Sequence, residues 1–222
     1  MNEPRVVCTA SDIGETWAGI PGIEVTPNGR VFVVWFSGGE REPDPQNRAY
    51  LVSSEDGGDT FSPPLVMAEP RDGSRAFDPT LWIAPNRALW LIYNRSNRTN
   101  AKHAVVARVC NRPDALETVW SDELPIGFDV PFCFRLNKPT VLSSGEWVMP
   151  VTHAPNLTWT LHGAVEAPEW ALENMIVERA DTRDRISYPD AAWSRDGTVH
   201  AVYDRDRGGA GAILLVRFRV SR

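Results

Sequence analysis

The sequence has few cysteines and no long run of like charge or of apolar residues. Its three cysteines, Cys8, Cys110 and Cys133, show no metal-site spacing and cannot all pair, so we expect them to be small core residues. No apolar stretch approaches the length that a membrane-spanning segment needs. Lysine and arginine form no run and the formal net charge is −6, which argues against nonspecific binding to nucleic acid.

The beginning of the chain and its helical content exclude further classes. The N-terminal residues lack a basic region followed by an apolar run, so the sequence predicts no signal peptide and a cytoplasmic location. No long amphipathic helix is evident. Since no metal-ligand spacing is present either, we expect no metal and no cofactor.

Tryptophan, proline and glycine, in contrast, are abundant, with 9, 18 and 16 residues among 222. Glycine and proline form tight turns, and this composition is typical of an all-β domain with many short strands. Hydrophobic residues make up 42% of the chain, which is enough for a large core and argues against disorder. The length suits one large domain or two small ones.

The stretch SEDGGDTF at 54–61 combines turn residues with Ser, Asp, Gly and Thr at alternating positions. Asp56 can hydrogen-bond the neighbouring backbone, and the two glycines after it allow positive φ. The preceding residues have strand propensity, Phe61 can fold back as an apolar plug, and the prolines at 63–64 stop further regular structure. We therefore expect a hairpin tip that Ser, Asp and Thr side chains hold together.

Four segments share one plan, which is a proline, an apolar strand, a turn and a second apolar strand. They are 20–35, 78–93, 138–151 and 188–203, with turns at 28–29, 86–87, 144–145 and 196–197. Their prolines, Pro21, Pro79, Pro139 and Pro189, lie 58, 60 and 50 residues apart. Repeats of about 40–60 residues with four strands each indicate a β-propeller. The alternative is a β-sandwich whose hairpins are alike by chance, and four matching units favour the propeller.

These hairpins and the Ser-x-Asp-x-Gly-x-Thr-Phe pattern of 54–61 resemble the sialidase (neuraminidase) superfamily, in particular its branch with bacterial-neuraminidase repeats and Asp-boxes. The resemblance covers roughly 18–220, and 187–218 is similar to the family's last recognisable unit. It implies a six-bladed β-propeller, which at this repeat length needs more residues than the chain has. We therefore predict a single domain over 1–222 with about four to five blade units and a missing segment near 180–186.

In this family the inner strands begin around a central axis, so the residues beside each repeat proline converge at one mouth. Sialidases use a Tyr nucleophile and a neighbouring Glu that takes its proton, because a free Tyr titrates near pH 10. The resemblance gives these roles to Tyr188 and Glu173, and it makes Glu173 the start of a further unit at 173–181. It places an acid/base Asp in the loop after the first hairpin, for which we choose Asp44. The other acids of that loop are Glu40 and Glu42.

The resemblance also implies a way to bind an anionic sugar. Sialidases hold the substrate carboxylate with three arginines, because a guanidinium pairs bidentately with a carboxylate. This chain departs from that pattern, since Gly19 stands where the first arginine usually precedes Ile-Pro and only 14 residues separate Glu173 from Tyr188. The remaining candidates for substrate binding are Arg75, Asp78, Arg135, Lys138, Arg185 and Arg205. We assign none of them to a triad.

Three functions stay open on the sequence. The resemblance implies an exo-glycosidase for a terminal acidic sugar, with an acidic glycan as partner. The missing arginines favour instead a non-catalytic propeller that binds glycan or protein, or a degenerate homologue. A third alternative is a propeller lyase on uronic-acid polysaccharide, with a Tyr base and His153 or His162 as the acid. An incomplete ring would expose an unpaired edge near 176–188, through which we expect self-association.

Overall fold

The computed structural model describes residues 5–97, 102–126, 133–135, 137–141, 145, 147–153, 157–163, 171–176, 186–196, 198–205 and 211–219. Within these ranges the chain forms strands and one short 3-10 helix, η1 (Ala10–Ile13), with no α-helix. The strands are β1 (Arg5–Thr9), β2 (Gly19–Val25), β3 (Val31–Ser37), β4 (Arg48–Ser54), β5 (Leu65–Ala68), β6 (Arg75–Ile83), β7 (Leu89–Asn97), β8 (Lys102–Cys110), β9 (Leu124–Pro125), β10 (Cys133–Arg135), β11 (Thr140–Val141), β12 (Trp147–His153), β13 (Leu157–Gly163), β14 (Ala171–Ile176), β15 (Ile186–Trp193), β16 (Thr198–Arg205) and β17 (Ala212–Arg219). The predicted all-β class is confirmed. No helix in the described ranges has the length and apolar character to cross a membrane.

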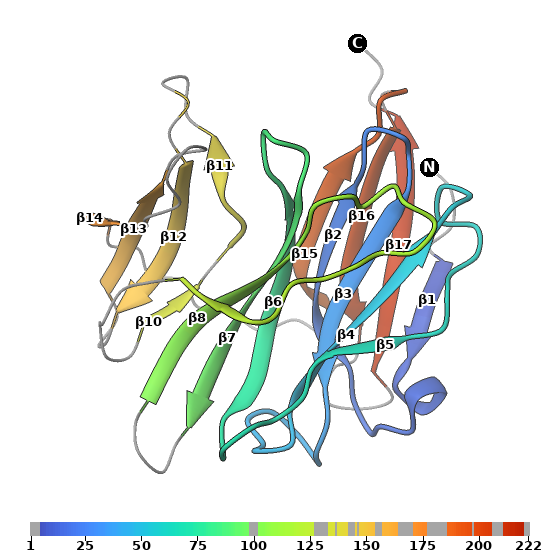
Figure 1. Cartoon of the computed structure of the whole chain (residues 1–222). Helices are drawn as coiled ribbons and strands as arrows, with labels where there is room; N and C mark the ends of the chain where they lie inside the picture. The colour runs from blue at the N-terminus through green and yellow to red at the C-terminus, as the bar shows by residue number, and fades with distance from the viewer. Residues whose placement is uncertain are drawn as a thin grey trace.

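The described strands form four antiparallel sheets, which we number in chain order (Figure 1). The first sheet has the order β2-β3-β4-β5 and the second has the order β6-β7-β8-β9. In the third sheet, β10 and β11 both pair with β12, and β13 and β14 follow outward. The fourth sheet has the order β15-β16-β17-β1. The N-terminal strand therefore completes a sheet that the C-terminal part of the chain begins.

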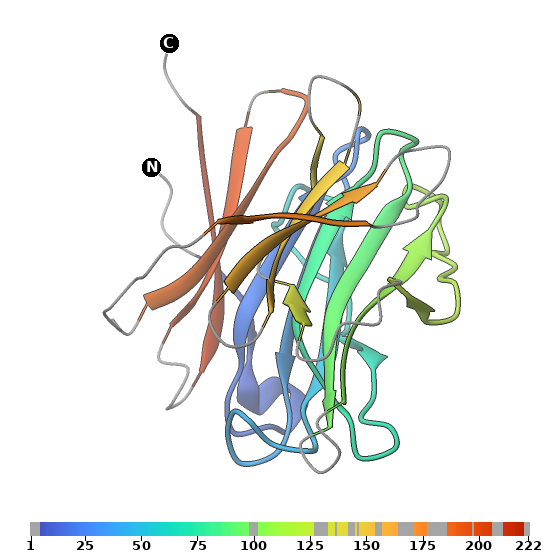
Figure 2. The same cartoon turned by 90° about the vertical axis from the view of Figure 1, so that its left-hand side faces the viewer.

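The sheets pack side by side in the order fourth, first, second, third. β15 lies beside β2, β2 lies beside β6, and β10 lies beside β8. Figures 1 and 2 show this succession from two directions. A separate hydrophobic cluster fills each of the three interfaces, and the fully buried Trp35, Tyr93 and Trp147 each belong to one of them. Sheets stacked in this way are the blades of a β-propeller.

Strand β3 is apolar at every position from 31 to 36, without the alternation of apolar and polar residues that a strand with one exposed face has. Val31, Val33 and Trp35 belong to the cluster shared with the fourth sheet, whereas Phe32 and Val34 belong to the cluster shared with the second. Successive side chains of a strand point to opposite faces, so a strand covered on both faces buries every residue. All seven residues of β3 are buried.

The hairpin turns lie where the repeats predict them. β2 pairs with β3, β6 with β7, β11 with β12 and β15 with β16. Gly29 and Gly145 have φ values of 93° and 86°, and Arg87 has a φ of 67°, so these turns use the left-handed region that a tight hairpin requires. The second strands of these hairpins contain Trp35, Trp90, Val148 and Val202.

The turn at 54–61 is held by the side chains that its pattern indicates. Asp56 Oδ1 accepts hydrogen bonds from the backbone N–H groups of Asp59 and Thr60, both at 2.9 Å. Asp56 Oδ2 accepts from Thr60 Oγ1 at 2.6 Å, and Ser54 Oγ donates to Oδ1 at 2.7 Å. The hydrogen bonds from Thr60, and then that from Ser54, hold the pKa of Asp56 well below its usual value.

The same turn also contacts the fourth sheet. Arg217 of β17 donates to the carbonyl of Gly57 at 2.6 Å and to Asp59 Oδ1 at 2.6 Å. Gly58 has a φ of 90°, and a Cβ at this position would lie 2.6 Å from a methyl group of Leu215. Phe61, predicted to be largely buried, is partly buried against the cluster between the first and fourth sheets. The turn therefore fastens two blades together.

The structure can be compared with the expectations that the cysteines lie in the core and that the propeller is incomplete. Cys8 and Cys110 are buried free thiols, as predicted. The side chain of Cys133 lies outside the described residues, as does the segment 177–185, which includes most of the predicted missing segment near 180–186. The described residues form four sheets, at the lower end of the expected number of blades. The single-domain organisation and the missing segment stay predictions.

Candidate functional site

The inner strand of each sheet is interrupted at its repeat proline. The pairing register shifts between Gly19 and Gly22 in β2, across 77–80 in β6 and across 187–190 in β15. In the third sheet the interruption separates β10 from β11, just before Thr140. The residues immediately before the prolines therefore occupy equivalent places in their blades. They are Ile20, Asp78, Lys138 and Tyr188.

Two of these residues have a strained backbone. Ile20 has a φ of 53° and Asp78 a φ of 48°, in the left-handed region that non-glycine residues avoid. A residue before proline normally adopts an extended conformation, so positive φ is especially unfavourable there. Asn94 on β7 holds Asp78 with a long hydrogen bond of 3.5 Å to Oδ2. Because strain of this kind concentrates at functional sites, we define the mouth as the end of the sheets at which these residues and the loop 38–47 lie, at the bottom of Figure 1.

An aromatic cluster supports a cation at the mouth. The rings of Trp17 and Phe36 meet edge to face with centroids 5.0 Å apart. The centroid of the Phe77 ring lies 6.4 Å from that of Phe36. The guanidinium carbon of Arg75 lies 3.7 Å from the centre of the Phe77 ring, which is a close cation–π contact. Arg75 Nη1 also donates to Asn47 Oδ1 at 2.9 Å. Arg75 is therefore held in a defined position at the start of β6.

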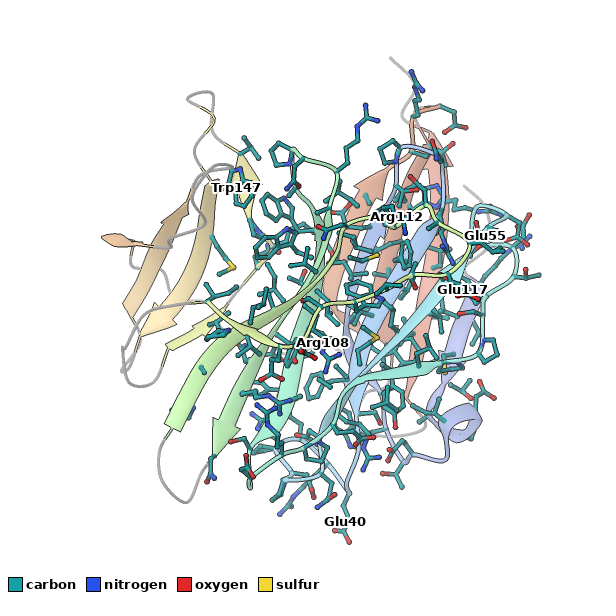
Figure 3. All side chains as sticks on the ribbon, viewed as in Figure 1. Glu40, Glu55, Arg108, Arg112, Glu117 and Trp147 are labelled. Atoms are coloured by element: carbon teal, nitrogen blue, oxygen red, sulfur yellow. The ribbon has the colours of Figure 1, made fainter. Side chains whose placement is uncertain are left out.

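The loop 38–47 follows β3 and brings acidic residues to the mouth. Asp44 Oδ1 accepts from the backbone N–H of Gln46 at 2.8 Å. The Asp44 carboxylate lies over Gly39, whose φ is 74° and where any Cβ would overlap the carboxylate. Glu40, in contrast, is exposed and points away from the sheets (Figure 3). The Asp44 carboxylate is therefore held against its own loop, whereas the Glu40 carboxylate extends into solvent.

Lys138, predicted to bind substrate, forms ion pairs with carboxylates of two other sheets. Its Nζ lies 3.1 Å from Asp190 Oδ1, 3.2 Å from Glu24 Oε1 and 2.9 Å from the carbonyl oxygen of Ile23. Burial raises the pKa of Glu24, while the charge of Lys138 opposes that rise. The ammonium group thus forms ion pairs with two largely buried carboxylates. It joins the third sheet to the first and the fourth.

Three predicted residues reach the mouth end by their backbone positions. Tyr188 lies near the start of β15, Arg205 ends β16 and Arg135 ends β10, all at the end where β6 begins. Their side chains lie outside the described residues, as does the whole of Arg185. The substrate-binding roles of these residues stay predictions.

Glu173 lies elsewhere in its blade than expected. Residues 171–176 form β14, the outermost strand of the third sheet, where Glu173 is opposite Thr160. The expectation that a further unit begins at 173 is therefore wrong, because this segment completes the third sheet. The Glu173 side chain lies outside the described residues.

The two histidines considered for a lyase lie at opposite ends of the third sheet. His153 pairs with Leu157 at the mouth end, whereas His162 pairs with Val148 near the other end. Strands rise by about 3.3 Å per residue, so the two imidazoles cannot serve one site. Only the backbone position of His153 is compatible with the mouth.

Two Tyr–Glu pairs, which sequence reasoning missed, lie beside the mouth and are structural. Tyr93 donates to Glu123 Oε2 at 2.6 Å, and Tyr50 donates to Glu15 Oε1 at 2.8 Å. Burial, followed by the adjacent carboxylate, raises the pKa of Tyr93 to about 12 and also raises that of Tyr50. Both rings are buried, so neither phenol can meet a substrate. No local pattern marks these pairs, because their partners are 30 and 35 residues apart.

A hollow of about 290 Å³ lies at the other end of the second sheet, away from the mouth. It is lined by Val109, Asn111, Arg112, Glu117, Val119, Trp120 and Ser121. Arg112 and Glu117, labelled in Figure 3, have opposite charges, so the hollow has no strong preference for an ion of either sign. Among the described residues no group of three or more His, Cys, Asp and Glu side chains could hold a metal ion.

Comparisons with known proteins agree with this architecture. No family model and no curated protein sequence matches the chain. Among solved structures, the Hadza microbial sialidase Hz136 matches with a TM-score of 0.64 and 16% identity over 97% of this chain and 47% of that chain. The leech intramolecular trans-sialidase matches with a TM-score of 0.60 and 11% identity, over 100% and 54% of the two chains. The intramolecular trans-sialidase from Ruminococcus gnavus matches with a TM-score of 0.59 and 11% identity, over 97% of this chain and 73% of that chain.

The chain spans about half the length of the first two of these proteins. At identities of 11 to 16%, the likeness concerns the fold. The strand order, the three buried interfaces and these neighbours lead to one conclusion. The chain has a sialidase-like β-propeller fold.

Proposed function

We propose that the chain carries the active-site mouth of a sialidase-like exo-glycosidase, which hydrolyses a terminal acidic sugar of the sialic acid type from a glycan. One observation carries the proposal, the repeated interruption of the inner strands before their prolines. It gives Tyr188 the same blade position as Ile20 and Asp78, whose strained backbones lie at the mouth. The sialidase-like fold supports this placement of the mouth.

In the proposed reaction Tyr188 is the nucleophile. Its phenolic oxygen bonds to the anomeric carbon as the glycosidic bond breaks, and a carboxylate at the mouth takes the phenolic proton. Asp44 protonates the departing glycan oxygen, and in a second step it accepts a proton from the water that hydrolyses the glycosyl–tyrosine bond. A neutral phenol suits an anionic sugar, because a carboxylate nucleophile would be repelled by the carboxylate of the substrate.

The polar groups around the mouth would bind the sugar. Arg75 is held at the mouth by its contact with Phe77, and a guanidinium is well suited to a carboxylate. We propose Arg135, Arg185 and Arg205 as further cations, since two of them end strands at the mouth and the third immediately precedes β15. Asp78 would accept hydrogen bonds from sugar hydroxyl groups.

Turnover of a fluorogenic sialoside tests this proposal. We expect Tyr188→Phe to lower kcat by about a thousandfold or more, as removal of a nucleophile does elsewhere, with an unchanged circular dichroism spectrum. Tyr203→Phe, on the neighbouring strand β16, is the matched control and should keep the wild-type rate. Glu173→Gln should keep the wild-type rate, because Glu173 lies on the outermost strand of its blade. Full activity of Tyr188→Phe would contradict the tyrosine mechanism.

A non-catalytic propeller that binds an acidic glycan is the second candidate. Two observations favour it, the glycine at position 19 where sialidases usually have an arginine and the commitment of Lys138 to Glu24 and Asp190. Calorimetric titration with 3′-sialyllactose separates the two candidates. Binding without release of free sialic acid would support the binding protein, and release of the sugar would support the enzyme.

A further inference from the structure

Asn47, immediately before β4, is a fully buried asparagine that uses all of its side-chain hydrogen-bonding groups. Its Nδ2 donates to the carbonyl oxygens of Gly38 and Arg41, at 2.6 and 3.2 Å. Its Oδ1 accepts from the backbone N–H of Asp44 at 3.0 Å and from Arg75 Nη1 at 2.9 Å. An asparagine side chain offers two N–H donors and one oxygen with two lone pairs, so no group is left over.

The backbone of Asn47 extends the same connection. Its N–H donates to the carbonyl of Asp44 at 3.1 Å, and its carbonyl accepts from the N–H of Ala76 on β6 at 3.0 Å. One residue thus closes the loop 38–47 of the first sheet and attaches it to the inner strand of the second. Oδ1 accepts from the loop and from Arg75 together, so one atom links the position of Arg75 to that of Asp44.

We propose that Asn47 is the positioning residue of the mouth, which couples the acidic loop 38–47 to the cation Arg75. The coupling has a physical basis in the shared oxygen. If Arg75 leaves Oδ1, that oxygen loses its charge-assisted hydrogen bond in a buried place, and the loop that Asn47 closes loses stability with it. Asn47 itself is 0% exposed and cannot touch a substrate. The inference rests on the proposed function only in naming Asp44 and Arg75 as the groups that meet the sugar.

A purely local role for Asn47 predicts something different. If the residue only closed its own loop, the two Nδ2 bonds and the Asp44 contact would suffice, and the loop would be indifferent to Arg75. Removal of Arg75 therefore separates coupling from loop closure. Arg75 is also a safer substitution than Asn47, because it is only partly buried and Asn47→Ala would leave several buried groups without partners.

The experiment is hydrogen–deuterium exchange followed by mass spectrometry on the whole chain. We expect Arg75→Ala to speed exchange of the amides in 38–46 by about tenfold, the effect of losing one charge-assisted hydrogen bond, while 54–61 keeps its wild-type rate. Arg71→Ala is the matched control, since Arg71 forms its ion pairs with Glu123 and Asp72, outside the loop. Unchanged exchange of 38–46 in Arg75→Ala would overturn the coupling, and so would an equal increase in Arg71→Ala.

A second arm uses N-acetylneuraminate as the probe. In the wild type the sugar should slow exchange in 38–46, because it would engage Arg75 and Asp44 together, and Arg75→Ala should abolish that protection. If the wild type neither binds the sugar nor turns over a sialoside, the proposed function fails. The response of the loop to Arg75→Ala in the absence of sugar still decides whether the coupling exists.

Discussion

Glu123, just before β9, keeps its charge in a buried place because arginines surround it. Arg95 donates to both of its oxygens at 2.7 to 2.9 Å, and Tyr93 and Arg71 contact it as well. Burial alone would raise the pKa of Glu123, but the hydrogen bonds from Arg95 and Tyr93 and the charges of the arginines outweigh it, so the pKa is lowered. A carboxylate with a lowered folded-state pKa stabilises the fold above its unfolded-state value, here 4.5, and this contribution is lost as the pH falls through the folded-state pKa.

Glu123→Gln tests this charge cluster. At pH 7 it should lower the free energy of unfolding by about 3–5 kcal/mol, because the buried Arg95 is left without a counter-charge. Melting temperatures measured between pH 3 and pH 7 should fall less steeply on acidification in the variant than in the wild type, since the variant has no carboxylate to protonate. Asp122→Asn, at an exposed neighbour, should reproduce the wild-type curve. Parallel curves for Glu123→Gln and the wild type would contradict this account.

Single residues were predictable from the sequence only where a repeat marked them. Ile20, Asp78, Lys138 and Tyr188 were found because each precedes a repeat proline, and the structure gives them equivalent strand positions. The direction of a side chain was not predictable in the same way. Lys138 points to the carboxylates of two other sheets, which lie more than 50 and 110 residues away in sequence.

At the scale of the elements, the 54–61 turn was predictable because the hydrogen bonds that shape it are local. Its Ser, Asp and Thr lie within seven residues, so the spacing alone defines the hydrogen bonds. Asp56→Ala should lower the melting temperature, because the backbone N–H groups of Asp59 and Thr60 lose their acceptor. Asp59→Ala should have a smaller effect, since it removes only half-exposed ion pairs with Arg5 and Arg217.

Thermal unfolding followed by circular dichroism provides the measurement for both variants. Sialoside turnover at a temperature where both are folded should remain at the wild-type level, because the turn lies at the end of β4 opposite the mouth. An unchanged melting temperature for Asp56→Ala, or a larger loss for Asp59→Ala, would show that the turn does not depend on the Asp56 carboxylate.

Elements that depend on distant partners were not predictable. The pairing of β1 with β17 brings together residues more than 200 positions apart, and no local pattern indicates it. The loop between β8 and β9 packs against the first sheet through Arg30, which donates to the carbonyl oxygens of Pro113 and Ala115 at 3.1 and 2.7 Å. These partners are more than 80 residues apart in sequence. β14 was misread for a different reason, because a strand that closes one blade and a strand that begins the next have similar compositions.

At the scale of the whole molecule, the third sheet is attached to the others in two different ways. At the end away from the mouth, Trp147, labelled in Figure 3, meets Trp82 of the second sheet edge to face, with ring centroids 4.6 Å apart. Toward the inner strands, Lys138 is the contact that reaches both the first sheet, through Glu24, and the fourth, through Asp190. The first attachment is apolar and independent of pH, whereas the second depends on three charges. The two can therefore be separated by titration.

Lys138→Met removes the charged attachment and keeps most of the side-chain volume. At pH 7 we expect the free energy of unfolding to fall by about 3–5 kcal/mol, because the buried carboxylates of Glu24 and Asp190 lose the charge of Lys138. The pKa of Glu24 is already raised by burial, and loss of Lys138 removes the charge that opposes this rise. A carboxylate with a raised folded-state pKa favours the folded state below its unfolded-state value, and that contribution is lost as the pH rises through the folded-state pKa. The deficit of the variant should therefore be largest at neutral pH and should shrink toward pH 4.5, the unperturbed value for Glu.

Urea unfolding of both proteins at a series of pH values measures that deficit. Lys102→Met, which removes the only other lysine of the chain, controls for the loss of one positive charge. The control should show no deficit that depends on pH in this way, since Lys102 lies at the start of β8 and not between the first, third and fourth sheets. A deficit in Lys138→Met that grew on acidification would mean that the loss of stability does not come from these two carboxylates. Stability equal to the wild type at pH 7 would mean that the apolar attachment alone holds the third sheet in place.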